Sequence, residues 1–241
     1  MKRFPKTELM SVVSVAFGIV GLVMQRWLRD SADAQGLLQS GHFATGLSFV
    51  LLLVVAAGNL MVLGDVKSEG EHDSLFPKSV FAALGSFLGA AGILVSTFSF
   101  KDAGILTVLV TALGILSAVA LGYAGFCRLQ GKQPQFLLFA VVTVLLIFRT
   151  LAACRVWSAE VQVQSFVFPL LANFSLLLAT YYRTNLCAEQ KNCRQYMFFR
   201  QLAVFCCLLS CVWGDSVFYL AGAVWLITDF CNPDFYGKYA T

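Results

Sequence analysis

Long hydrophobic runs separated by short polar segments make up nearly the whole chain. Most runs reach the ~20 apolar residues that an α-helix needs to cross a hydrocarbon core of ~30 Å. The pattern therefore predicts an all-α polytopic membrane protein, a bundle of about eight transmembrane helices. They are expected near residues 8–27, 42–64, 78–98, 104–125, 135–157, 165–183, 198–213 and 216–231.

The last two runs are shorter than the others, and only Gly214 and Asp215 separate them. At 1.5 Å per residue, each covers ~24 Å, slightly less than the hydrocarbon core. Two crossings are favoured over one re-entrant hairpin. The polar segments between runs are too short to fold alone, so residues 1–241 are expected to form a single integral membrane domain without a soluble domain.

Charge and tryptophan positions favour one orientation in the membrane. With a cytoplasmic N-terminus, 12 of the 17 basic residues fall on the inside, and the C-terminus is cytoplasmic too. This distribution follows the positive-inside rule. Independently, three tryptophans fall at predicted outer helix ends, where indole rings prefer the headgroup region. These are Trp27, Trp157 and Trp213.

The composition agrees with this architecture and excludes several classes of protein. Hydrophobic residues make up 59% of the chain and charged residues only 12%, too little charge for a soluble protein of this size. The net charge of +4 is spread between the hydrophobic runs, which argues against nucleic-acid binding. Eight cysteines without a CxxC pair and only two histidines predict no metal site, and no cofactor motif is present. The overall character is that of a bacterial plasma-membrane protein.

Small residues recur at four-residue spacing in two neighbouring predicted helices. Gly114, Ala118 and Gly122 form one row, and Gly85 with Gly89 forms another. Such rows let helix backbones approach closely in lipid, where no hydrophobic force drives helices together. We expect these helices to pack tightly, against each other or against another helix of the bundle. A homodimer face or a sliding gate is the alternative.

Arg149 is the most informative single residue, because it lies inside the fifth hydrophobic run, ~20 Å above its cytoplasmic end. One interpretation is an arginine that snorkels toward the outer surface. The other is a buried arginine paired with Asp215 or Glu160. The second predicts an outer polar cluster of Arg149, Asn173, Asp215 and Tyr219 that binds an anion or serves as a structural ion pair.

Three other polar features lie toward the predicted inner side. Asn59 and Asp229 are each expected to hydrogen-bond a neighbouring helix. The basic and aromatic segment Lys191–Arg200 is expected on the inner membrane surface, next to anionic lipid.

Three functional classes fit these features. The first, and the favoured one, is an accessory protein that packs in the bilayer against a membrane partner or a second copy of itself. The second is a transporter or binder of a small anionic or lipidic solute, with a polar cavity at Arg149. The third is an intramembrane enzyme, which is the least favoured because no catalytic motif is present.

Overall fold

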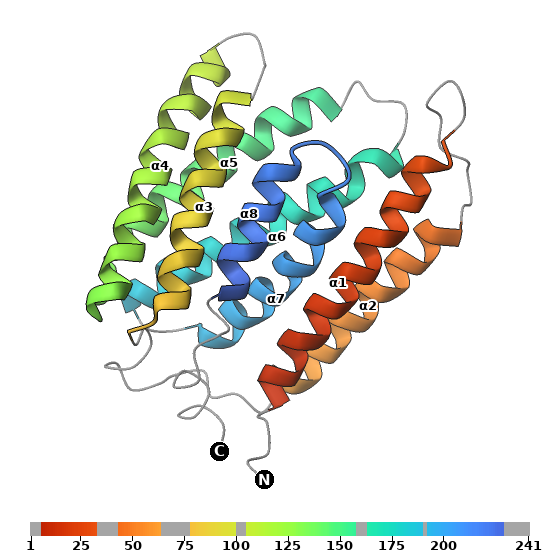
Figure 1. Cartoon of the computed structure of the whole chain (residues 1–241), viewed down its shortest axis with the longest axis horizontal. Coiled ribbons are helices and arrows are strands. Elements are labelled where there is room, and N and C mark those ends of the chain that lie inside the picture. The colour runs from red at the N-terminus through yellow and green to blue at the C-terminus, as the bar shows by residue number, and fades with distance from the viewer. Residues whose placement is uncertain are drawn as a thin grey trace.

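The computed structural model describes residues 6–32, 43–63, 78–99, 105–157, 163–189 and 192–228, which form eight α-helices and no strand (Figure 1). The helices are α1 (Lys6–Asp30), α2 (Phe43–Leu63), α3 (Val80–Ser99), α4 (Ile105–Gln130), α5 (Phe136–Trp157), α6 (Val163–Glu189), α7 (Cys193–Ser210) and α8 (Ser216–Thr228). Six of them, α1 to α6, are long and apolar enough to cross a membrane. The predicted helical membrane bundle is confirmed at this level.

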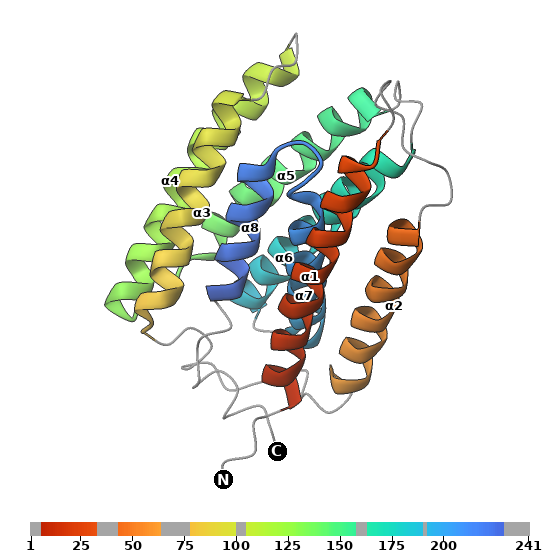
Figure 2. The same ribbon diagram turned by 45° about the vertical axis from the view of Figure 1, so that its right-hand side comes forward.

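Six helices close into a ring, and the other two pack on its outside. Helix α3 packs on α4, α4 on α5, and so on to α8, which returns to α3. The hairpin of α1 and α2 packs mainly on α7. Figures 1 and 2 show this hairpin along one side of the bundle, with α3 and α4 along the opposite side. Helix α1 begins and α8 ends at the same end of the bundle (Figure 1).

Several helix boundaries differ from the predicted ones, and two of these differences change the environment of the inner polar residues. Helix α6 continues to Glu189, six residues beyond its predicted end, and α7 begins at Cys193 instead of residue 198. The expected surface segment Lys191–Arg200 is therefore wrong over its described part, because Tyr196, Met197 and Arg200 are buried within α7. The prediction relied on the polar composition of this segment. Packing of these side chains against neighbouring helices overrides that local preference.

A glycine ends α4 and sets up the turn into α5. Gly131 has a φ of 71°, in the left-handed region that favours glycine. Its N–H donates to the Arg128 carbonyl, and the next N–H, of Lys132, donates to the Cys127 carbonyl at 2.9 Å. This is the Schellman arrangement, which satisfies carbonyls that the helix end leaves free.

Glycines also set the spacing between α3 and its two neighbours. A Cβ added at Gly92 would lie 2.0 Å from the Ala221 Cβ of α8, and one added at Gly89 would lie 3.1 Å from the Trp225 Cβ. On α4, a Cβ added at Gly114 would lie 2.2 Å from the Thr97 Oγ1 of α3. Gly85 likewise faces Thr228, and Ala118 is buried.

The predicted packing row on α4 does not extend to Gly122. A Cβ added there would meet nothing within 4 Å, so the prediction is wrong for this residue. The position that approaches α3 lies three residues further on. A Cβ at Gly125 would lie 3.1 Å from the Ser86 Cβ.

Helix α1 carries a second row of mostly small residues, which the sequence analysis did not identify. Its buried positions follow the alternating three- and four-residue spacing of helices that cross at a shallow angle. They are Ser11, Ser14, Gly18, Gly21, Gln25 and Leu28. Cβ atoms added at Gly18 and Gly21 would lie 2.6 and 2.4 Å from Cδ1 of Leu208 and Leu209 on α7. The row thus brings α1 close to α7.

Candidate functional site

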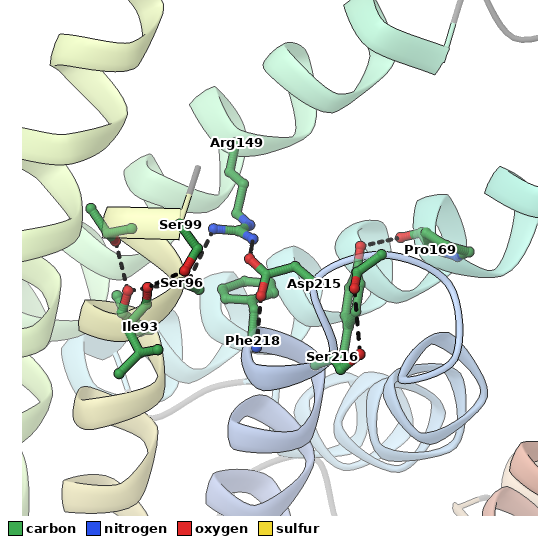
Figure 3. Close-up of polar contacts among 12 residues, drawn as sticks. Ile93, Ser96, Ser99, Arg149, Pro169, Asp215, Ser216 and Phe218 are labelled. Carbon is green, nitrogen blue, oxygen red and sulfur yellow. Dashed lines mark hydrogen bonds and ion pairs between the residues drawn. The ribbon is translucent and has the colours of Figure 1, made fainter. Parts of the chain in front are cut away.

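Arg149 points into the bundle rather than into lipid. The residue is 5% exposed, and its side chain reaches from α5 toward the turn between α7 and α8 (Figure 3). There the guanidinium forms an ion pair with Asp215, and its Nη1 donates to the Ser96 Oγ of α3 at 3.2 Å. Its Cζ lies 3.7 Å from the centre of the Phe218 ring. Three helices and the turn therefore hold one buried cation in place.

Asp215 links this cation to the start of α8. It directly precedes the helix, and its Oδ1 accepts a hydrogen bond from the Phe218 N–H at 3.3 Å. A carboxylate in this position caps the helix and interacts favourably with the positive end of the helix dipole. Since the Asp215 side chain is 25% exposed, the ion pair lies at the edge of the buried core.

Helix α1 holds the same turn from its other side. The Arg29 Nη1 donates to the Val212 carbonyl at 2.7 Å, and the Trp213 Nε1 donates to the Gln25 Oε1 at 2.7 Å. Gln25 also donates through Nε2 to the Ser48 Oγ of α2. The turn from 211 to 215 is consequently fixed by polar contacts to both α1 and α5.

Asn173 and Tyr219 form a second polar pair close to the ion pair. The Asn173 side chain lies beside the Tyr219 hydroxyl, which donates to the Pro169 carbonyl of α6 at 3.4 Å. Within the described structure, the buried Asn173 Oδ1 has no hydrogen-bond partner. The four residues predicted as an outer cluster thus form two adjacent pairs, Arg149 with Asp215 and Asn173 with Tyr219. Glu160, the other predicted acid, lies outside the described residues.

A small apolar cavity lies inside the ring, next to Phe218. It is lined by residues of four helices, namely Gly89, Ile93, Val142, Leu146, Leu176, Phe218, Gly222 and Trp225. Phe218 and Trp225 are seven residues apart on α8, so ~10 Å of helix separates them. The cavity is bordered by α8 between these two residues, and it is apolar, whereas the transporter interpretation predicted a polar cavity at Arg149.

A second buried arginine stacks on Trp225, one of the residues that line this cavity. The Cζ of Arg183, on α6, is 5.1 Å from the centre of the Trp225 ring and 4.3 Å from that of Phe139. Its Nη1 donates to the Tyr196 hydroxyl of α7 at 3.4 Å. Arg200 also lies over the Tyr196 ring, 5.3 Å from its centre.

From the sequence, Arg183 was expected only as a basic residue of the inner side, and Arg200 as the last residue of the segment on the inner membrane surface. Both are almost completely buried. Aromatic residues nearby in the sequence, Tyr182, Tyr196 and Phe199, were the available signal, because arginine stacks on aromatic rings when it is desolvated. Asn59 also differs from its prediction, which was a hydrogen bond to a neighbouring helix. It is buried, but neither side-chain polar atom has a hydrogen-bond partner in the described structure.

Metal binding finds no support among the described residues, which contain no group of three His, Cys, Asp or Glu side chains able to hold an ion. Asp229, the remaining acid predicted near the inner end, lies outside the described ranges. No protein-family model, curated protein or solved structure matches this chain.

Proposed function

We propose that this protein binds a small amphiphilic anion inside the α3–α8 ring and carries it across a cell membrane. In this proposal all eight helices cross the bilayer, and both chain termini lie in the cytoplasm. The excess of basic residues on one side favours that orientation. The two ends of the described chain, at the start of α1 and the end of α8, lie at the same end of the bundle, in agreement with an even number of crossings (Figure 1).

The observation that carries the proposal is a pair of buried arginines that stack on two aromatic residues lining one apolar cavity, Phe218 and Trp225. Arg149 covers Phe218, and Arg183 lies over Trp225. On insertion scales a single arginine at the centre of a helix costs ~3 kcal/mol, so buried arginines are rare where they have no function. The cavity volume of about 10 Å³ is roughly that of one water molecule, so the ring helices must move apart to admit a solute with an apolar body and an anionic group.

Arg149 and Trp225 both offer chemistry for that anionic group. Arg149 already holds a carboxylate, that of Asp215, so a solute carboxylate or phosphate can take the same place. The indole N–H of Trp225 is buried and has no hydrogen-bond partner in the described structure, although the residue lines the cavity. A solute acceptor would satisfy that donor.

The proposal predicts that bromo-octanoate quenches the fluorescence of Trp225 in the protein reconstituted into nanodiscs. Quenching should saturate with concentration, and bromo-octanol, which lacks the charge, should quench more weakly. Arg149→Gln should reduce the difference in quenching between bromo-octanoate and bromo-octanol, because this difference depends on the carboxylate. Arg26→Gln is the matched control, because Arg26 forms an exposed ion pair with Asp30 on the outside of the bundle. Trp225→Phe should remove the saturable signal.

A single result separates specific binding from partition into lipid. If both bromo compounds quench equally, and Arg149→Gln behaves like Arg26→Gln, the cavity is not a binding site for anions. The proposal is then wrong.

The accessory function is a second candidate, favoured by how well the interior is filled. Most buried apolar side chains of α3 to α8 belong to one cluster, and the cavity within it is small. In that case the Arg149–Asp215 pair only fixes the turn before α8. This candidate predicts no response to either bromo compound, together with specific cross-linking to another membrane protein or to a second copy of the chain.

A further inference from the structure

A separate set of buried polar atoms lies between the α1–α2 hairpin and α7, outside the ring. Asn59 on α2 and Gln201 on α7 are 0% and 1% exposed. In the described structure neither Asn59 polar atom has a hydrogen-bond partner, and the same holds for the Gln201 Oε1. The Gln201 Nε2 donates to the Ser11 Oγ of α1 at 3.2 Å. Three amide atoms are thus unsatisfied within one interface.

Two independent contacts put Asn59 and Gln201 at the same level of the bundle. A Cβ added at Gly58, the neighbour of Asn59, would lie 2.7 Å from the Met10 Cε, and Met10 directly precedes Ser11, the partner of Gln201. Leu63 lies one helical turn after Asn59, and Met197 lies one turn before Gln201. Leu63 and Met197 belong to the same apolar cluster. Because α1, α2 and α7 all pack on one another, the two buried amides lie at the same level of one three-helix interface.

The unsatisfied amide atoms determine which ligand fits this interface. They comprise two amide oxygens, which accept hydrogen bonds, and one amide nitrogen, which donates them. A cation would need more oxygen ligands, and the carbonyls of regular helices are already used within α1, α2 and α7. An anion would meet more acceptors than donors. A neutral molecule that both donates and accepts hydrogen bonds matches the set.

We propose that Asn59, Gln201 and Ser11 form a hydration site that holds internal water between α1, α2 and α7. Buried waters typically make about three hydrogen bonds to groups that would otherwise be unsatisfied, the number of free amide atoms here. Without such a ligand each amide would be desolvated in an apolar interface at a cost of roughly 1–3 kcal/mol.

Radiolytic footprinting with mass spectrometry tests this proposal, because hydroxyl radicals formed from bound water oxidise adjacent side chains. Met10, which borders the site through Gly58, is the reporter. Met61, on the same helix α2 and 79% exposed on the apolar outer face, is the dry reference. In nanodiscs we expect Met10 to be oxidised several-fold faster than Met61.

The variant that removes the site is Asn59→Leu combined with Gln201→Leu, and it should lower the oxidation rate of Met10 several-fold. The matched control is Ser48→Ala on α2, which removes a hydrogen bond to Gln25 at the other end of the same interface and should leave Met10 unchanged. Equal Met10 rates in the double variant and the wild type would overturn the proposal. If the double variant does not fold, the wild type alone decides, since a Met10 rate as low as that of Met61 means a dry interface.

Discussion

At the scale of single residues, the charge of Asp215 can be separated from its capping role. Asp215→Asn keeps an oxygen for the Phe218 N–H but leaves the Arg149 cation uncompensated. We expect a loss of ~2 kcal/mol in the free energy of unfolding, less than for a fully buried pair because Asp215 is partly exposed. Combining it with Arg149→Leu should lose less than the sum of the single changes. Unfolding in mixed detergent micelles measures this, and strictly additive losses would contradict the pairing.

Arg149 and Asp215 could be brought together from sequence because charged residues inside an apolar run are rare and require a partner. Arg183 and Arg200 escaped notice for the opposite reason. They stand near predicted helix ends, where basic residues are expected on topological grounds, and only the continuation of α6 and the early start of α7 bury them. Hydropathy distinguishes segments in lipid from segments in water. It does not predict which residues become buried between helices, because that depends on how the helices are arranged.

At the scale of helices, the contact between α3 and α8 depends on Gly92. Its added Cβ would meet Ala221 at 2.0 Å, and since a Cβ cannot rotate away, the two helices must separate. We expect Gly92→Ala to lower the free energy of unfolding by about 1–3 kcal/mol. Gly122→Ala on α4 is the matched control, because its Cβ meets nothing within 4 Å. Equal losses for the two substitutions in the same unfolding assay would contradict close packing of α3 on α8.

The small-residue spacing predicted that α3 and α4 pack closely, but not which helix each row faces. Gly85, Gly89 and Gly92 face α8, which lies far along the sequence, while α4 faces the other side of α3. A four-residue repeat of small residues predicts a face on which another helix can approach closely, but it does not identify that other helix. The repeat also does not predict at which residue the close contact between the helices ends. Gly122 continues the repeat but turns away from α3, because a straight helix rotates relative to its neighbour along its length.

At the scale of the whole molecule, the division into a six-helix ring and a two-helix hairpin was not predictable from the sequence. Hydropathy treats α1 and α2 like any other spanning helix, yet α2 contributes only a narrow buried stripe from Ala44 to Leu63. In lipid, helices that are already inserted associate through local packing and hydrogen bonds. The hairpin therefore behaves as a separate unit, held on the ring by its close contact with α7.

This division predicts that the protein can be assembled from two pieces. If the chain is cut between residues 63 and 78 and the two parts are co-expressed, they should co-purify in mild detergent, because α1 meets α7 through Gly18 and Gly21. Gly18→Leu together with Gly21→Leu should separate them, since these side chains would overlap Leu208 and Leu209. Gly46→Leu on α2, which meets open space, is the control and should leave the parts associated. Loss of association in the control as well, or pieces that never associate, would mean that the contact with α7 does not hold the hairpin.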